Sequence, residues 1–309
     1  MSEDALWPRA INWLIESTDA NRQAVEAGDD SNAGFAVDLG IVGVPAHLTS
    51  ISPTGANATP GAVRDALRRY STWSWQHQVD LRSLTIFDFG DSVNPDNTDG
   101  EALTSGFTAV ATESAKLSVV IGGDNSVTFA AMRGAAPVLS RAGLITFDAH
   151  HDLRDGVSNG SPVRRLIEAG LPGSQVAQIG IADFSNSPEY AQRAKDLGVT
   201  VIPRAALRSQ TPAQVWAIAV AALGDVDVIY VDIDVDVCDR AEVPACPAAA
   251  PGGFSADELR QFAFLAGNEP RVNCIDITEI DATADSADQR TVRLAALLIL
   301  EAAAGLAKR

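Results

Sequence analysis

The stretch AGLITFDAHHD, residues 142–152, is an apolar run that ends in a group of charged side chains. A short apolar run bounded by polar residues is typical of a buried β-strand. Side chains on a strand alternate between its two faces with a period of two residues. Three polar residues of the stretch are therefore predicted to share one face: Asp148, His150 and Asp152.

A second stretch, VDVIYVDIDVD at residues 226–236, ends in the same way. The same alternation predicts a common face for Asp232, Asp234 and Asp236. Each acid alone has a simpler explanation as a helix cap or a solvated loop residue. Two such groups on parallel strands, however, would gather several carboxylates and one imidazole at the edge where open α/β sheets bind ligands.

Eight short apolar runs recur along the chain, at residues 35–45, 84–91, 117–124, 142–152, 174–183, 199–203, 226–236 and 271–281. Helix-like segments lie between or after them, at residues 59–70, 211–223, 255–267 and 287–307. This alternation indicates βαβ units and a parallel sheet covered on both faces. The pattern fits an open sheet or a closed barrel equally well. We expect an N-terminal helical extension over residues 1–34 and a single α/β domain over residues 35–309.

Gathered carboxylates would repel one another, and several of them would have to bind protons. Divalent cations between the carboxylates would remove this repulsion. A ligand set of many carboxylates and one histidine favours Mn²⁺ over Zn²⁺, whose sites rely more on histidine and cysteine. The sequence therefore predicts a metal site at this edge of the sheet.

The chain of 309 residues carries a formal net charge of −17, which disfavours nucleic acid and anionic membranes as partners. Its apolar segments are shorter than a membrane span, and MSEDALWPRA at the start has no signal-peptide pattern, so we expect a cytoplasmic protein. The three cysteines lack paired spacing and are expected to be reduced thiols. Because Cys238 and Cys246 lie near the carboxylates, metal ligation is their alternative role.

Four segments resemble, in this order, the signatures of the arginase/agmatinase family of binuclear manganese ureohydrolases: GGDNS (122–126), DAHHD (148–152), DVDVCDRAEVPACPAAAPGG (234–253) and ITEID (277–281). The resemblance runs over most of the chain. It implies a three-layer α/β/α sandwich around a mainly parallel eight-stranded sheet, assembled as a homo-oligomer, a trimer or a hexamer. The family pattern aligns on Asp234 and Asp236, which leaves Asp232 outside the ligand set.

The resemblance implies that two Mn²⁺ ions are held by six side chains: Asn125, Asp148, His150, Asp152, Asp234 and Asp236. Asp148 and Asp234 would bridge the ions. Asn125 stands where the family usually has a histidine ligand. An amide oxygen binds a metal ion more weakly than imidazole does, so we expect one loosely held ion and activity that depends on added Mn²⁺.

The resemblance also implies catalytic roles for Asp152, Glu279 and Asn159. Glu279 would pair with the cationic amidine or guanidine of a small-molecule substrate. Asn159 stands where the family commonly has a histidine that is proposed to relay protons, which an amide cannot do in the same way. Four residues are the candidates for substrate binding: Arg154, Ser158, Asn159 and Glu279.

Several segments resemble the formimidoylglutamase subgroup of the family, whose members release formamide from N-formimidoyl-L-glutamate in histidine degradation. They are TPGAVRDALRRYSTW (59–73), DLRDGVSNGSPVRRLIEAGLPG (152–173), NSPEY (186–190) and the CP within PACPAAAPGG. One alternative is agmatinase, guanidinobutyrase or another guanidino-acid ureohydrolase, which would release urea. The other is a metal-poor, non-catalytic homologue.

Arg154 bears on the choice of substrate. A guanidinium group binds a carboxylate through two parallel hydrogen bonds. N-formimidoyl-L-glutamate carries two carboxylates, whereas agmatine carries none and would be repelled by the arginine. The alternative is that Arg154 pairs with Asp155 or Asp152 and serves to neutralise the acidic cluster.

Overall fold

The computed structural model describes residues 4, 6–26 and 36–309 of the chain. Its centre is an open, eight-stranded sheet in which every neighbouring pair of strands is parallel. In spatial order the strands are β4 (Ile86–Asp91), β1 (Val37–Val44), β5 (Ala115–Gly122), β10 (Val272–Thr278), β9 (Val228–Asp234), β6 (Ala142–Phe147), β7 (Val176–Ile181) and β8 (Thr200–Pro203). The open edges at β4 and β8 exclude the closed barrel that the sequence left open.

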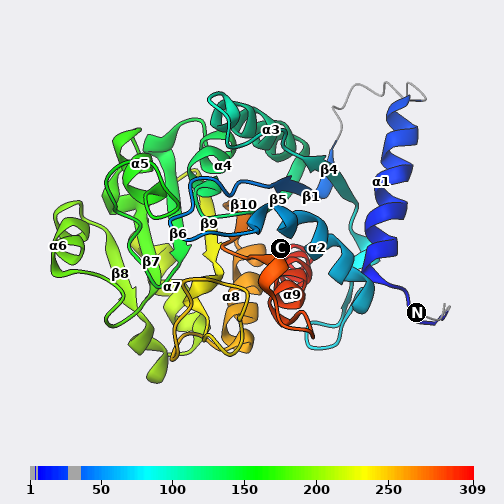
Figure 1. Ribbon diagram of the computed structural model, residues 1–309. Coiled ribbons are helices and arrows are strands. Elements are labelled where there is room, and N and C mark those ends of the chain that lie inside the picture. The colour runs from blue at the N-terminus through cyan, green and yellow to red at the C-terminus, as the bar shows by residue number, and fades with distance from the viewer. Residues whose placement is uncertain (1–3, 5, 27–35) are drawn as a thin grey trace.

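Helices cover both faces of the sheet (Figure 1). On one face lie α2 (Thr59–Ala66), α7 (Pro212–Ala222), α8 (Ala256–Asn268) and α9 (Arg290–Leu306). The other face carries α3 (Gly100–Ser114), α4 (Val127–Ala135) and α5 (Pro162–Glu168), with α6 (Pro188–Asp196) beside β8. The predicted three-layer α/β/α sandwich is therefore confirmed.

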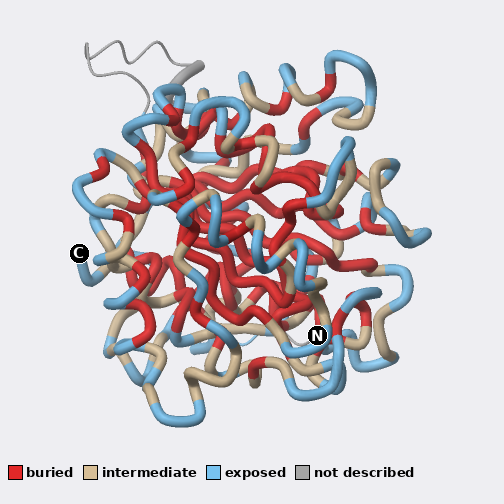
Figure 2. The backbone as a smooth tube through the Cα atoms, turned by 90° about the vertical axis from the view of Figure 1, so that its left-hand side faces the viewer, coloured by how far each residue is buried: buried red, intermediate tan, exposed pale blue. Residues whose placement is uncertain are grey.

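Alternation along the strands produces two apolar cores, one on each face of the sheet. In β5, Val119 and Ile121 pack into the core under α2, α7, α8 and α9, whereas Val120 packs into the core under α3, α4 and α5. Figure 2 shows this arrangement as buried strands at the centre of the molecule, surrounded by exposed turns. Both faces of a parallel sheet have to be covered in this way, because its strands are apolar on both sides.

Helix α1 (Ala10–Glu26) covers the edge of the sheet beside β4. The hydroxyl groups of Ser17 and Thr18 accept hydrogen bonds from the backbone N–H groups of Ile86 and Asp88, at 2.9 and 3.0 Å. The helix thereby pairs donors that an edge strand would otherwise expose. The predicted extension contains this helix, but residues 27–35, where the predicted domain boundary falls, lie outside the described residues, and the division at residue 34 stays a prediction.

Two of the predicted helices, α7 and α8, begin at side-chain caps, whereas α2 and α9 have no side-chain cap among the described residues. At the start of α8, the capping box of Ser255 and Glu258 is present in both directions, and Thr211 and Gln214 form a second one before α7. Helix α9 begins at Arg290, a few residues later than predicted. In the described part of the chain no helix is long and apolar enough to cross a membrane.

Smaller elements complete the chain. A two-stranded antiparallel hairpin joins β2 (Trp73–Ser74) and β3 (Val79–Asp80). Short 3₁₀ helices are η1 (Ala56–Ala58), η2 (Leu67–Arg69), η3 (Leu81–Ser83), η4 (Leu139–Arg141), η5 (Gly173–Gln175), η6 (Arg204–Arg208), η7 (Val235–Val237) and η8 (Ala282–Ala284).

Strand β6 is shorter than the sequence predicts, because it ends at Phe147. The prediction that Asp148, His150 and Asp152 alternate along a strand is therefore wrong. These residues belong to the loop that follows β6, and Asp152 has a φ of 53°. In the same way β9 ends at Asp234, and Asp236 lies in η7.

Candidate metal centre and active site

The candidate site lies at the carboxyl ends of four adjacent central strands, β5, β10, β9 and β6. Asn125 follows β5, Glu279 follows β10, Asp234 ends β9, and Asp148 follows β6. Each strand therefore delivers its polar residue at the same edge of the sheet, which is where open α/β sheets bind ligands.

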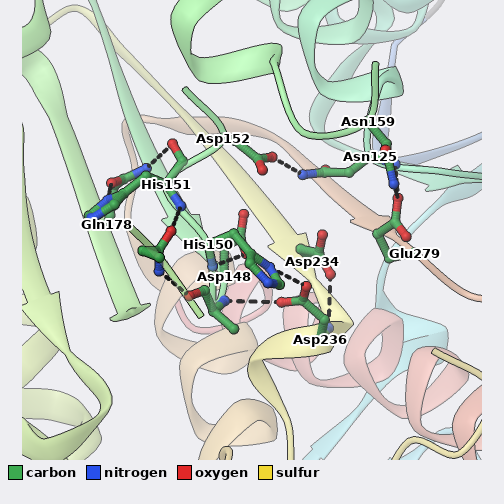
Figure 3. A network of polar contacts seen from close by, with 12 residues as sticks. Asn125, Asp148, His150, His151, Asp152, Asn159, Gln178, Asp234, Asp236 and Glu279 are labelled. Carbon is green, nitrogen blue, oxygen red and sulfur yellow. Dashed lines mark hydrogen bonds and ion pairs between the residues drawn. The ribbon is translucent and has the colours of Figure 1, made fainter. Parts of the chain in front are cut away.

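At the centre of the site Nδ1 of His150 lies 2.7 Å from Oδ2 of Asp236 and 3.4 Å from Oδ1 of Asp148 (Figure 3). One ligand atom from each of these three residues lies within 4.8 Å of the others. Carboxylate oxygens also fold the loops: Asp148 accepts from the backbone N–H of His150 at 2.6 Å, and Asp234 accepts from that of Asp236 at 2.8 Å. The loops are thus held in place by the same side chains that face the centre.

The centre holds more buried carboxylate than its own cations can balance. Asp148, Asp234 and Asp236 are each at most 3% exposed. Burial and the charge of Asp236 raise the pKa of Asp148 to about 7, and burial followed by the charges of Asp236 and Asp148 raises the pKa of Asp234 well above its usual value. Oδ2 of Asp148 is buried and has no hydrogen-bond partner among the described residues. Such a donor set, rich in carboxylates with one imidazole, fits Mn²⁺.

His150 takes part in this balance. Although burial works against the charged imidazole, the carboxylates of Asp236 and Asp148 raise the pKa of His150 to about 12. The imidazolium then stands in for part of the positive charge that the surrounding acids require. A metal ion that binds here must replace that proton.

Asn125 and Asp152 meet beside this centre. Nδ2 of Asn125 donates to Oδ2 of Asp152 at 2.6 Å, and Oδ1 of Asn125 lies 2.9 and 2.8 Å from the hydroxyl oxygens of Thr128 and Thr278. In this arrangement the carbonyl oxygen of Asn125 faces away from Asp152. Burial and the charge of Asp148 raise the pKa of Asp152 well above its usual value.

Glu279 is fixed by the residues around it. Its Oε1 accepts hydrogen bonds from the backbone N–H of Asn125 at 2.7 Å and from Nδ2 of Asn159 at 2.8 Å. Oδ1 of Asn159 in turn accepts from the backbone N–H of Ile51 at 3.0 Å, which ties the loop around Ile51 to the site. Burial raises the pKa of Glu279 to about 7, and its backbone φ is 63°.

A cavity opens onto these groups. Its walls include His150, Asp152, Arg154, Asn159, Asp234, Asp236 and Glu279. The side chain of Arg154 makes no ion pair or hydrogen bond with any residue in the described part of the chain. The alternative that Arg154 neutralises a neighbouring acid is wrong, because Asp155 pairs with Arg193 at 2.9 Å and Asp152 with Asn125.

The side chains of the other two arginines near this loop already form ion pairs with protein carboxylates. Arg164 pairs with Glu168 and donates to the backbone oxygens of Arg154 and Gly156. Arg165 pairs with Glu101 at 2.7 Å. Among the described residues that line the cavity, Arg154 therefore supplies the one guanidinium group, and it is available to an acidic ligand.

A family model described as the arginase family matches residues 37–305. The chain belongs to the arginase family. It is 38% identical to a formimidoylglutamase from Halalkalibacterium halodurans over 276 residues, which are 85% of each chain, and 34% identical to one from Bacillus subtilis, over 86% of each.

Solved structures of family members are similar to this one. The crystal structure of formimidoylglutamase from Bacillus subtilis has a TM-score of 0.82 at 31% identity and covers 89% of this chain, 88% of its own. The structure of Trypanosoma cruzi formiminoglutamase with Mn²⁺ has a TM-score of 0.80 at 26% identity and covers 88% of this chain, 94% of its own.

The arginase-family motifs account for most of the predicted site residues, and the structure brings these together. Two residues lie elsewhere: the acid that the family pattern left outside the ligand set, Asp232, and the predicted substrate-binding residue Ser158. Asp232 is fully buried within the sheet, opposite Asp276 in the strand register, as the family pattern implied. Ser158 is not among the cavity-lining residues, and its hydroxyl accepts from the backbone N–H of Gly160.

Some cavity residues are outside the sequence predictions. Asn186 holds the ligand loop, since its side chain accepts from the backbone N–H of His151 at 3.0 Å and donates to the carbonyl of Ala149 at 2.9 Å. Ser185 and Tyr190 line the cavity beside it. The NSPEY segment resembled the formimidoylglutamase subgroup, but nothing in its composition indicated a place in the site.

No cysteine belongs to the group of possible metal-ligand atoms found among the described residues. All three cysteines lie in the described residues 36–309, are buried and form no disulfide. Burial raises the pKa of the Cys246 thiol well above its usual value, which disfavours the thiolate that a metal ion requires.

Proposed function

We propose that this protein is a formimidoylglutamase, a manganese-dependent hydrolase that cleaves N-formimidoyl-L-glutamate into L-glutamate and formamide. The observation that carries the proposal is the unpaired guanidinium of Arg154 in the same cavity as a cluster of buried carboxylates. The carboxylates suit metal ions and a cationic reacting group, and the arginine suits an acidic tail. An amidine with carboxylates at its far end combines both features.

The relatives support the same substrate. The formimidoylglutamases of Halalkalibacterium halodurans and Bacillus subtilis match about the same region of this chain. The Trypanosoma cruzi enzyme of this type was crystallised with Mn²⁺.

Six side chains would hold the manganese ions: Asn125, Asp148, His150, Asp152, Asp234 and Asp236. Bound manganese lowers the pKa of water and so supplies the nucleophile for hydrolysis at neutral pH. For Asn125 to contribute its carbonyl oxygen, its amide has to turn by 180° from the orientation in which Nδ2 donates to Asp152. An amide fits the same space in either orientation.

The protein's own residues would divide the remaining work. Ionised Glu279 pairs with the amidinium of the substrate, while Asn159 and the backbone of Asn125 hold the carboxylate in place. Arg154 binds a carboxylate of the glutamate moiety by charge-assisted hydrogen bonds. Asp152 lies where it can pass a proton to the departing amine of glutamate. Asn159 thus acts by orienting Glu279 and not by relaying protons.

We further propose that the protein is cytoplasmic and forms a homo-oligomer, a trimer or a hexamer. The three unpaired cysteines support a reducing compartment, and the family resemblance supports the assembly.

A substrate panel tests the proposed function against the guanidino-acid alternatives. Manganese-loaded protein is given N-formimidoyl-L-glutamate, agmatine or 4-guanidinobutyrate, and the products are separated. We expect formamide from the first compound with a kcat/KM far above that for either guanidino compound. If urea release from 4-guanidinobutyrate is the preferred reaction, the protein is a guanidino-acid ureohydrolase of the same family. If none of the three compounds is hydrolysed, the non-catalytic alternative is favoured.

A further inference from the structure

The amide of Asn125 lies between the candidate metal centre and a second, fully buried polar group. On the centre side is Asp152, at 2.6 Å from Nδ2. On the far side are the hydroxyl groups of Thr128 and Thr278, whose oxygens lie 2.9 and 2.8 Å from Oδ1. All these residues are less than a tenth exposed. Water therefore cannot correct an unfavourable orientation of the amide.

Thr128 has a stronger acceptor than Asn125 within reach. Its hydroxyl oxygen lies 2.8 Å from Oδ2 of Asp276, a fully buried residue of β10. The hydroxyl of Tyr230 donates to the same Oδ2 at 2.7 Å, and the backbone N–H of Ile233 donates to Oδ1 at 3.3 Å. Burial raises the pKa of Asp276 to about 6, and the three donors oppose this effect, so the carboxyl group is ionised above about pH 6.

A threonine hydroxyl carries a single proton, so Thr128 donates to Asp276 or to Asn125, but not to both. The carboxylate is the better acceptor because it is charged. When Thr128 donates to Asp276, its lone pairs face the outer atom of the Asn125 amide. A donor at that position then pairs with Thr128, which favours the turned amide, with Nδ2 facing the threonines and Oδ1 facing the metal centre. Thr278, whose hydroxyl donates to Oδ1 at 2.8 Å in the present orientation, then accepts from Nδ2 instead.

With Asp152 ionised, the turned amide needs a cation on its inner side. Without one, Oδ1 of Asn125 would lie against Oδ2 of the carboxylate, two acceptors with no proton between them. With a cation, both oxygens can bind the same ion. Asp276, acting through Thr128 on the outer side of the amide, and the metal ion on its inner side therefore favour the same orientation of Asn125.

We propose that Asp276 is a positioning residue which, through the hydroxyl of Thr128, turns the carbonyl oxygen of Asn125 toward the metal centre. This inference rests on the manganese centre of the proposed function and adds to it a residue that touches neither the metal nor the substrate. It explains how an asparagine serves where an imidazole would bind more strongly: Asp276 and Thr128 favour the ligating orientation of its amide when the ion binds.

Two substitutions remove this control. Asp276→Asn keeps the size of the side chain but allows its amide to donate to Thr128, whose proton then goes to Oδ1 of Asn125 and holds the amide in the non-ligating orientation. Thr128→Val removes the hydroxyl, and Thr128→Ser restores it. Thr108→Val on α3 is the matched control, because this buried hydroxyl has no partner among the described residues.

The readout is Mn²⁺ binding to metal-stripped protein without substrate, followed by electron paramagnetic resonance of free Mn²⁺. We expect two sites in the natural protein. For Asp276→Asn and Thr128→Val, the dissociation constant of the weaker site rises about 10- to 100-fold and that of the tighter site changes by less than about twofold. Thr128→Ser and Thr108→Val bind as the natural protein does. Thermal unfolding in EDTA confirms that each variant folds, and Thr128→Val carries the test if Asp276→Asn does not.

A second set of variants made in Asn125→Asp protein shows whether Asp276 acts by orienting the side chain at position 125 or only by supporting the local structure. A carboxylate presents oxygen on both sides, so its outer oxygen benefits from a donor, and Asp276→Asn should no longer weaken Mn²⁺ binding there. Equal weakening in both backgrounds would overturn the proposal. So would unchanged binding in both Asp276→Asn and Thr128→Val, or a natural protein that binds fewer than two Mn²⁺ ions. Because no substrate is present, failure to hydrolyse N-formimidoyl-L-glutamate would count against the proposed function alone.

Discussion

Nδ1 of His150 lies 2.7 Å from Oδ2 of Asp236, and this contact joins the loop after β6 to the loop after β9. The two loops are 86 residues apart in sequence when counted from His150 to Asp236, yet they form a single centre because β6 and β9 are neighbours in the sheet. In the metal-free protein this ion pair compensates part of the buried negative charge. It also predicts how stability depends on pH.

The stability of the metal-free protein should fall as pH rises. Burial and Asp236 raise the pKa of Asp148 from 3.8 to about 7, and burial raises the pKa of Glu279 from 4.5 to about 7. The carboxylates of Asp236 and Asp148, against the effect of burial, raise the pKa of His150 from 6.5 to about 12. In each case the folded state binds more protons than the unfolded state, so the free energy of unfolding decreases as pH rises from about 5 to about 8.

Bound Mn²⁺ favours the ionised carboxylates and should reverse this trend. The increase in Tm caused by MnCl₂ over EDTA is therefore expected to be larger at about pH 8 than at about pH 5. Thermal unfolding across this range in both conditions measures the effect. A metal-free protein that gains stability as pH rises through this range would contradict the charge balance described for the centre.

Asp234→Asn should abolish most activity while the fold is retained. Asp234 is 3% exposed, ends β9 and faces the centre, so the amide removes a charge that the metal ions require. Replacing a residue that only hydrogen-bonds to a metal ligand lowers metal affinity or activity about 10- to 100-fold. Loss of a ligand itself is therefore expected to lower kcat/KM by more than about a hundredfold. Asp196→Asn on the exposed side of α6 is the control. Turnover that survives in Asp234→Asn would rule out a ligand role.

Arg154→Met should weaken the binding of acidic substrates. The substitution keeps the apolar stem of the side chain and removes its charge. A hydrogen bond to a charged group contributes about 1.5–3 kcal/mol, so kcat/KM for N-formimidoyl-L-glutamate is expected to fall about 10- to 100-fold, mainly through KM. Arg208→Met, an exposed arginine outside the cavity walls, serves as the control. If KM is unchanged in Arg154→Met, the carboxylates of the substrate bind elsewhere.

Asn159→Ala should shift the pH profile of the reaction. The hydrogen bond from Asn159 lowers the pKa of Glu279, opposing the larger effect of burial, so its loss raises that pKa further. Because ionised Glu279 is the form that pairs with the amidinium, the acidic limb of the profile of kcat/KM should move to higher pH. Asn268→Ala, whose side chain contacts the carbonyl of Gly305, is the control. An unmoved acidic limb would mean that Asn159 does not act through Glu279.

The sequence was sufficient to predict the strands, their parallel arrangement and the edge at which the site lies. Apolar runs separated by helix-like segments carry that information, and capping pairs such as Ser255 with Glu258 mark where helices begin. Whether the sheet is open or closed could not be predicted from the pattern, because a strand has the same signal in both. That choice depends on which strands become neighbours.

The details of the site could be predicted only in part. The alternation argument grouped Asp148, His150 and Asp152, which do lie at the same edge of the sheet, but it placed them on a strand that in fact ends at Phe147. A loop can converge on a centre without the period of two. The contact of Asn125 with Thr278 joins residues 153 positions apart, so no local signal could reveal it. Likewise, Arg154 is left without an ion pair because the neighbouring Asp155 pairs with Arg193, which is 38 residues away in sequence.

The most direct measurement is the identity of the products that the protein forms from N-formimidoyl-L-glutamate, followed by proton NMR in two samples. One sample contains protein stripped with EDTA, and the other contains the same protein after Mn²⁺ is restored. We predict L-glutamate and formamide in equal amounts in the second sample, and unchanged substrate in the first. Equal rates in both samples, or intact substrate in the presence of protein that has bound Mn²⁺, would contradict the account.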